Sequence, residues 1–358
     1  MKPRAPLFAF LAVVASCSAS GTEPDRIATD SSVGGDSSGD VARPDTESDG
    51  GFLTDAPPLD APPAVTQTIF ANTDDELYRM DPTTKAVALI GPFAGLDKSS
   101  GVGENMTDVA VNEAGDVWGC SVSSGTNPGH IFAIDVPPDT GEVVASTKAT
   151  LKSTSRFYAL AFAPAGVLGT GETLVGGDSL GDLYLIPTTG TATPQNLGGF
   201  GTVAVGDPGA GNTGDKWELS GDIAFFSNAG APIGLATLRP CTVSGTTHTC
   251  DNTNDVLVEI DLVELAKKSS ASKLRKRFIG KSGTGYPRLF GIGAWSSSVF
   301  AFTRCSGGTP CTKPSQLIEV SLTTGAGTVV KGFTDIDAKG NGWSGAGVST
   351  KAKIDLPK

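Results

Sequence analysis

The chain has 358 residues, of which 47 are glycine and 23 are proline, and only 7% are aromatic. Glycine and proline are the poorest helix formers, so this composition excludes an all-helical fold and a long coiled coil. A hydrophobic share of 39% is too high for a wholly disordered chain. The net charge of −11 argues against electrostatic nucleic-acid binding, and two histidines leave little room for histidine-based catalysis.

The N-terminus resembles a bacterial lipoprotein signal. Two basic residues precede an apolar run at residues 7–14, the pattern of a secretory signal peptide, and this run is about half as long as a membrane-spanning helix needs. The sequence Val-Ala-Ser-Cys at residues 14–17 resembles the lipobox, which implies removal of residues 1–16 and lipidation of Cys17. Ser18 in place of aspartate then implies sorting to the outer membrane, on its periplasmic or its surface face. An ordinary signal peptide with a chance cysteine is the alternative.

Residues 17–65 are predicted to be the lipidated cysteine and a disordered linker. Residues 18–65 hold ten acidic and two basic residues, a net charge of −8, and they end in a proline-rich run at residues 56–63. Such a segment buries too little apolar surface to offset its ordering entropy, and like charges and prolines keep it extended. We interpret it as a spacer, with an acidic binding tail as the alternative.

Two apolar units alternate through residues 66–358, which carry a mild net charge of −5. The first unit recurs every 52 to 74 residues, at residues 77–81, 131–135, 183–187, 257–261 and 317–321. The second is built from small and apolar residues, recurs every 51 to 69 residues, and is called the inner triplet below. The inner triplets are Val109-Ala110-Val111, Leu160-Ala161-Phe162, Ile223-Ala224-Phe225, Ile292-Gly293-Ala294 and Ala346-Gly347-Val348.

Periods near 50 residues with several short strands each indicate a β-propeller. Residues 111–118 are similar to the hairpin between the first two strands of a blade, and residues 77–84 with 88–91 resemble the third and fourth strands. The resemblance is to the broad NHL/quinoprotein-like propeller superfamily of bacterial surface proteins, with degenerate repeats. The small inner triplets are expected to lie at the crowded centre of the ring.

The order of the units predicts how the ring closes. The domain opens with an outer unit at residues 68–90 and ends with an inner one at residues 343–350, so these two must meet in one blade. We therefore expect an all-β, five-bladed propeller whose N- and C-terminal strands close the ring. Residues 198–216 leave room for a sixth blade, and a β-sandwich or β-solenoid is the alternative fold.

The cysteines predict two disulfides in an oxidising compartment. Cys241 and Cys250 bracket eight mostly polar residues, and Cys305 and Cys311 bracket a tight turn. Cys120 is left over in a strand, where a buried thiol is expected. Zinc is not expected, because no Cys-x-x-Cys pair occurs and the two histidines look isolated.

Several strings that look catalytic have structural interpretations. Residues 177–181, Gly-Asp-Ser-Leu-Gly, match a hydrolase motif, but no partner histidine follows, so a hairpin turn is predicted. Residues 209–214 match a dinucleotide-binding fingerprint without a helix after it, so a loop is predicted. Asp335, Asp337 and Asn341 only partly match a calcium loop. The basic run at residues 267–277 is interpreted as a solvated insertion, with contact to anionic lipid as the alternative.

Propeller ligands usually bind at the mouth of the channel, where the inner strands begin. Asp108 and Asp222 occupy equivalent places there, and two such carboxylates can hold a cation, share a proton or bind channel water. Calcium-dependent propeller lactonases use a carboxylate and amide set that this sequence matches only in part. The candidate mouth residues are Glu104, Asn105, Asp108, Arg156, Tyr158, Glu218, Asp222, Arg288, Asn341 and Trp343.

These features predict an exported, lipid-anchored protein of the cell envelope whose propeller is a binding or scaffold module. Its partners would be the membrane, through the anchor, and a protein, glycan or small molecule. Nucleic acid is not expected, and the domain should be monomeric. The alternative is a propeller enzyme, such as a lactonase, lyase or quinoprotein-like dehydrogenase, with its site at the mouth. No cofactor is expected, although calcium is left open.

Overall fold

Strands dominate the computed structural model, in agreement with the all-β prediction. The structure describes residues 68–99, 103–122, 129–153, 155–209, 211–228, 230–305, 313–338 and 342–357. All of them belong to one unit, Pro63–Lys358. The helices found in this part of the chain are α1 (Leu262–Ala266) and α2 (Thr334–Ala338). None is long and apolar enough to cross a membrane in the residues that the structure describes.

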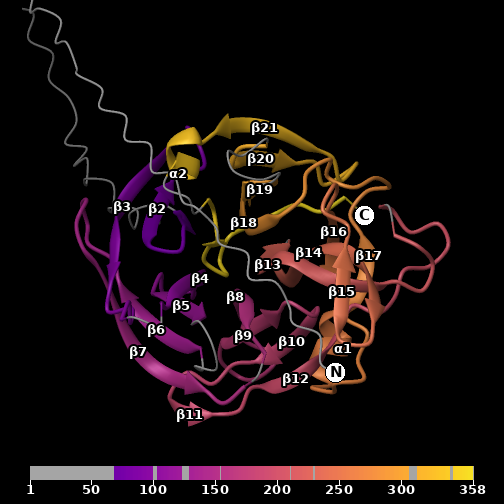
Figure 1. The fold of residues 1–358 in the computed structure, drawn as a ribbon, viewed down its shortest axis with the longest axis horizontal. Helices are drawn as coiled ribbons and strands as arrows, with labels where there is room; N and C mark the ends of the chain where they lie inside the picture. Colours follow the sequence, from indigo (N-terminus) through magenta and orange to yellow (C-terminus); the bar gives the residue numbers. More distant parts are fainter. Residues whose placement is uncertain are drawn as a thin grey trace, which may run out of the picture. The chain divides into compact units, whose positions relative to one another are not determined.

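The strands form antiparallel groups of four around a common centre (Figure 1). Given from the centre outward, the first group is β22 (Gly345–Gly347), β1 (Ile69–Asn72), β2 (Glu76–Met80) and β3 (Val87–Ala94). The second group is β4 (Asn105–Val111), β5 (Val117–Val122), β6 (His130–Asp135) and β7 (Val143–Leu151). Parallel pairing of β3 with β7 joins these two groups into one sheet.

Three further groups complete the arrangement. The third is β8 (Phe157–Ala163), β9 (Thr173–Asp178), β10 (Asp182–Leu185) and β12 (Gln195–Gly199). The fourth is β13 (Lys216–Asn228), β14 (Ala231–Ser244), β16 (Val256–Ile260) and β17 (Arg275–Phe278). The fifth is β18 (Leu289–Trp295), β19 (Ser298–Thr303), β20 (Gln316–Val320) and β21 (Gly327–Gly332). Two short strands flank them, β11 (Gly190–Ala192) beside β7 and β15 (Thr247–Cys250) beside β14.

The two alternating units of the sequence occupy the predicted places. The inner triplets lie in β4, β8, β13 and β18 and at β22. Each of these strands contacts the next around the centre, where small residues let the backbones approach. The first unit of the sequence forms the third strand of each group. This strand is buried on both faces in β16, and three of its five residues are buried in β2. Residues 177–181 form the turn between β9 and β10, as predicted.

The predicted closure is confirmed by the pairing of β1 with β22. Phe70 lies opposite Gly347 and Asn72 lies opposite Gly345, so strands from both ends of the domain share one sheet. This pairing occupies the edges that an open ring would leave free. In the segment between β12 and β13, the described residues form only an isolated bridge, Thr202 with Lys216, and no additional strand.

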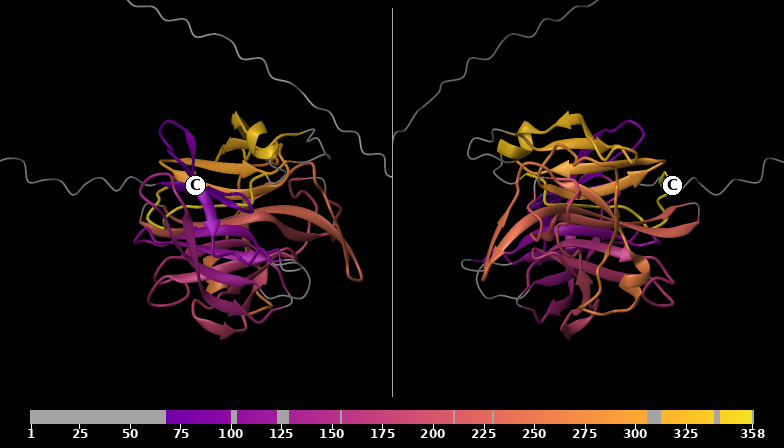
Figure 2. Two further views of the ribbon diagram at one scale, coloured as in Figure 1. Left: turned by 60° about the vertical axis from the view of Figure 1, so that its left-hand side comes forward. Right: turned by 90° about the vertical axis from the view of Figure 1, so that its right-hand side faces the viewer.

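The segment after β22 crosses the end of the ring where the inner strands finish. Ser349 bridges to Val111 at the end of β4, and Lys353 bridges to Ser227 near the end of β13. Three apolar side chains of this segment are buried in the largest core cluster: Ala352, Ile354 and Leu356. This covering segment was not predicted from the sequence. Two side views of the ribbon show the turn between β14 and β15 projecting beyond the sheets (Figure 2).

We predict that Gly345→Ala destabilises the ring. A Cβ atom at residue 345 would lie 2.0 Å from Asp108 Oδ1 and 2.6 Å from Asp108 Cα, and the backbone contact cannot yield easily. Overpacking of this kind costs about 1–3 kcal/mol. Urea unfolding of the full chain measures the change in the free energy of unfolding.

Gly332→Ala is the matched control, because a Cβ atom at that position in β21 meets nothing within 4 Å. That variant should change the free energy of unfolding by less than about 1 kcal/mol. Equal unfolding midpoints for the two variants would show that β22 does not pack closely against β4.

Candidate functional site

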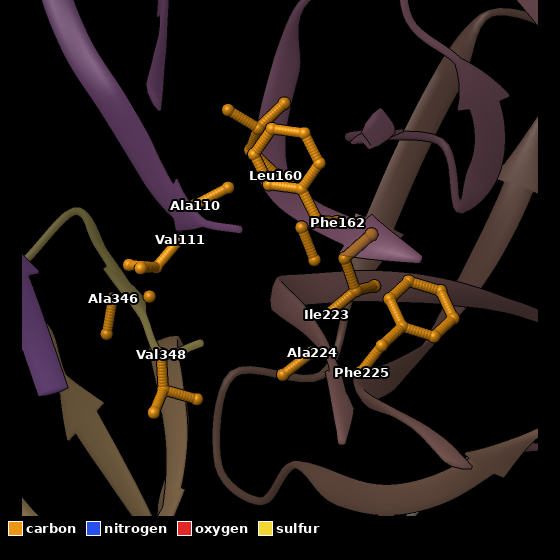
Figure 3. Close-up of a pocket in the computed structure, with 11 residues that line it drawn as sticks. Ala110, Val111, Leu160, Phe162, Ile223, Ala224, Phe225, Ala346 and Val348 are labelled. Atoms are coloured by element: carbon orange, nitrogen blue, oxygen red, sulfur yellow. The ribbon is translucent and has the colours of Figure 1, made fainter. Parts of the chain in front are cut away.

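The axis of the ring is almost filled by apolar side chains. Residues from β4, β8, β13 and the β22 region surround a space of only about 10 Å³, which is close to the minimum for one water molecule. Figure 3 shows only carbon on the side chains that line it, among them Val111, Phe162, Phe225 and Val348. A ligand therefore cannot pass along this part of the axis.

Asp108 and Asp222 lie beside this axis, in β4 and β13, and both are fully buried. Each accepts a hydrogen bond from the backbone of the following inner strand: Leu160 N lies 2.6 Å from Asp108 Oδ2, and Ile292 N lies 2.5 Å from Asp222 Oδ2. Burial raises the pKa of both carboxyls, and the charge of Asp222 raises the pKa of Asp108 further.

Both candidate glutamates bind a histidine. Glu104 Oε1 accepts hydrogen bonds from His130 Nδ1 at 2.7 Å and from Ser121 Oγ at 2.5 Å. Glu218 Oε1 accepts a hydrogen bond from His248 Nδ1. Each glutamate stands four residues before one of the buried aspartates and is itself buried. The two histidines look isolated in the sequence, but each contacts a glutamate that stands four residues before a buried aspartate.

A cavity of about 240 Å³ opens where the inner strands begin. Four of its lining residues occupy one register position, two residues before an inner triplet: Thr107, Tyr158, Phe290 and Ser344. The same position of β13 is Gly221, where a Cβ atom would lie 2.4 Å from Leu289 O and Phe290 Cα. Asn105, Val122, Asp74 and Arg304 complete the lining. We call this space the mouth cavity.

Arg304 is held rigidly at the edge of the mouth cavity. Its guanidinium makes two hydrogen bonds of 3.2 Å to the Asp74 carboxylate and one of 3.0 Å to Ser344 Oγ, and it lies over the Phe290 ring at 5.9 Å. Arg304 also lines a second cavity of about 220 Å³, together with Tyr286 and Lys313. The paired Arg–carboxylate geometry fixes the orientation of the guanidinium.

The predicted mouth residues are only partly brought together. Asn105 and Tyr158 line the mouth cavity, whereas Glu104, Asp108, Glu218 and Asp222 are buried and are not among its lining residues. Arg288 donates to the Cys305 carbonyl at 3.1 Å, and Arg156 is exposed in the bend before β8. Asn341 lies outside the described residues.

Trp343 is a core residue. Its side chain is fully buried, and its ring packs edge-on against Tyr78, Phe302 and Phe333, each at a centroid distance of 5.0 Å. The indole Nε1–H has no hydrogen-bond partner among the described residues, so contacts with the three aromatic rings have to offset the cost of burying this donor. Trp343 therefore anchors the strand that closes the sheet.

The disulfide between Cys241 and Cys250 is confirmed. Cys120 is a buried free thiol, and burial raises its pKa to about 12. The predicted bond of Cys305 involves Cys311, and the predicted lipidation involves Cys17. Both of these partners lie outside the described residues.

The remaining candidate patterns have structural roles where the structure describes them. Asp335 and Asp337 lie in α2, and Asp337 accepts a hydrogen bond of 2.8 Å from Ser315 N. The basic run at residues 267–277 is largely ion-paired: Arg275 binds Asp207, and Lys276 and Arg277 both bind Glu259. Residues 267–274 lie between the outer strands β16 and β17, and residues 275–277 belong to β17. Five of the six basic side chains of the run are exposed, in agreement with a solvated insertion.

No protein-family model matches the chain, and no curated protein matches it. Among solved structures it aligns with regucalcin, a calcium-binding protein of Agrobacterium tumefaciens strain C58, at a TM-score of 0.31 and 13% identity, over 67% of this chain and 65% of that one. It also aligns with the computationally designed Ika8 protein at a TM-score of 0.27 and 11% identity, over 75% of this chain and 60% of that one. The chain spans less than two thirds of either structure, and its own strand order defines the propeller-like fold.

Another buried carboxyl, that of Asp255, joins the fourth and fifth groups. Its Oδ2 accepts hydrogen bonds from Ser220 Oγ and, at 2.9 Å, from Leu289 N, while Oδ1 has no partner among the described residues. Burial is the main cause that raises the pKa of Asp255 to about 7. The native state therefore binds this proton more tightly than the unfolded chain does.

We predict that the free energy of unfolding falls as the pH rises from about 5 to about 8. A carboxyl with a raised native pKa stabilises the fold at low pH, and this contribution is lost as the pH approaches the native pKa. Asp255 alone accounts for about 3 kcal/mol over this interval. Urea unfolding at both pH values, with Asp255→Asn as the variant, measures the effect. An unchanged pH dependence in Asp255→Asn would contradict this assignment.

Proposed function

We propose that this protein is an exported, lipid-anchored binding module of the cell envelope. In this proposal each group of four strands is one blade of a five-bladed propeller, carried on the linker of residues 17–65 and anchored through Cys17. The ligand is a small molecule, or the terminal unit of a glycan or peptide, and it binds in the mouth cavity. The observation that carries the proposal is this cavity, which lies at the open end of a ring whose axis is filled.

The chemistry of the mouth cavity supports recognition of a polar ligand with an apolar face. Tyr158 and Phe290 offer aromatic surfaces, Asn105 offers an amide, and Arg304 offers a fixed guanidinium. Pockets that combine apolar walls with a few oriented polar groups are typical ligand sites. A volume of about 240 Å³ lies below the usual range for drug-sized ligands, which favours a small group.

An enzyme at the mouth would need a general base or a set of metal ligands facing the cavity. The described lining residues include one carboxylate, Asp74, and Arg304 already binds it. The two Glu–His pairs are not among the lining residues. This lining supports a binding module over the alternative of a lactonase, lyase or dehydrogenase.

We predict that Tyr158→Ala and Phe290→Ala each weaken ligand binding by about tenfold or more, which corresponds to about 1.4 kcal/mol. The probe is a set of peptidoglycan and envelope-glycan fragments captured by the full chain, with affinities measured by titration of those captured. Val205→Ala, at a side chain that is 89% exposed away from the mouth cavity, is the control.

Both mouth variants are required to unfold at a urea concentration close to that of the unaltered chain, so that a loss of binding reports the site. Unchanged affinity in both variants would exclude the mouth cavity as the binding site. Stoichiometric calcium in the purified chain would instead support the enzyme alternative.

The anchor has its own test. Cys17→Ser removes the thiol that would be lipidated, and acyl chains contribute about 0.8 kcal/mol for each buried CH₂ group. We predict that this variant moves from the membrane fraction to the soluble fraction of the cell envelope. Retention of Cys17→Ser in the membrane fraction would contradict lipid anchoring and would leave the mouth cavity proposal unaffected.

A further inference from the structure

The base of the β14–β15 hairpin gathers three metal-ligating residue types on one face of the sheet. Cys241 in β14 lies directly opposite Cys250 in β15, and their disulfide closes the hairpin. Glu218 in the neighbouring strand β13 faces the same bond. Ligand atoms of Glu218, Cys241 and Cys250 all lie within 4.8 Å of one another.

One oxygen of Glu218 has no hydrogen-bond donor in this arrangement. Oε1 is engaged by His248 Nδ1, while Oε2 lies 3.6 Å from Cys250 Sγ. A disulfide sulfur carries no proton and cannot donate, and no other polar contact to Oε2 occurs among the described residues. Glu218 is 1% exposed, so an acceptor without a donor at this position is costly. The oxygen is buried and aimed at the two sulfur atoms.

We propose that reduction of the Cys241–Cys250 disulfide turns this face into a Zn²⁺ site. A dithiol reductant is oxidised to its own disulfide, and the sulfur–sulfur bond between Cys241 and Cys250 is reduced to two thiols. Binding of Zn²⁺ releases the two thiol protons, so that the ion is held by two thiolates and Glu218 Oε2. Water completes four ligands, the number usual for zinc.

The ligand set determines the class of ion. Thiolates select soft or borderline cations such as Zn²⁺, whereas Ca²⁺ and Mg²⁺ require oxygen ligands throughout. The two thiolates and the carboxylate together carry one more negative charge than the dication neutralises. While the disulfide is intact, neither sulfur is a thiolate and only Glu218 remains as a ligand, so we expect no zinc at this site in the oxidised chain.

His248 is a positioning residue for this site. Its Nδ1–H donates to Glu218 Oε1 and leaves Oε2 directed at the sulfur atoms, the arrangement by which outer hydrogen bonds orient metal ligands. The His248 side chain is 22% exposed and Cys250 is partly exposed. A reductant and a metal ion can therefore reach the site from this side of the hairpin.

The test uses the purified full chain, before and after reduction with a phosphine, which becomes a phosphine oxide. Each form is mixed with Zn²⁺, desalted and analysed for bound metal, and affinity is measured by competition with a chromophoric chelator. Cys305→Ser with Cys311→Ser is the background for every sample, because it removes the other predicted thiol pair. In a parallel sample, Co²⁺ replaces Zn²⁺ and reports thiolate ligation by its charge-transfer absorption.

We expect one Zn²⁺ per chain after reduction and none before it. Adding Cys241→Ser with Cys250→Ser should abolish binding, and Glu218→Gln and His248→Gln should each weaken it by roughly ten- to a hundredfold. The glutamine variants keep both thiols and the hairpin, so they separate ligation from folding. Zinc bound equally by the serine variant, or with unchanged affinity by Glu218→Gln, would overturn the proposal. The result is independent of ligand binding in the mouth cavity.

Discussion

The pairing of β1 with β22 is the interaction on which the rest of the structure depends. It places residues 69–72 beside residues 345–347 and thereby ties the two ends of the domain into one sheet. Without it the first group would lack its inner strand, and β4 and β18 would each lose a neighbour at the centre. Trp343 secures this pairing from inside, because three aromatic rings surround it.

Closure of the ring forces close packing at its axis, and this packing explains both the filled centre and the open mouth. The inner triplets fill the axis. At the position directly before the inner triplet, Asp108 accepts a hydrogen bond from the neighbouring inner strand, and Gly345 leaves room for the Asp108 carboxylate. At the position two residues before an inner triplet, side chains such as those of Tyr158 and Phe290 line the mouth cavity. Successive positions along one strand type therefore supply the core, the polar links between strands and the candidate site.

The strand units that recur along the chain could be predicted from the sequence. The inner triplets and the third-strand units were recognisable because crowding at the centre and burial on both faces recur in every group, and the order of units predicted closure. The site was predictable only in part, at Asn105 and Tyr158, because Asp74 and Arg304 reach the mouth cavity from segments 230 residues apart. Trp343 was predicted to lie at the mouth because two of its three aromatic neighbours, Tyr78 and Phe302, are remote from it in the sequence. The Glu–His pairs were missed because only pairing of the strands brings their members together.

Hydrogen exchange of the full chain tests the closed ring most directly. If the ends of the domain form one sheet, the amides of β1 and β22 should exchange only with global unfolding, together with those of β4 and β13. Because these amides report global unfolding, their protection should fall together as the pH rises from about 5 to about 8. Rapid exchange in β22, with β4 and β13 still protected, would contradict the closed ring and the single open mouth derived from it.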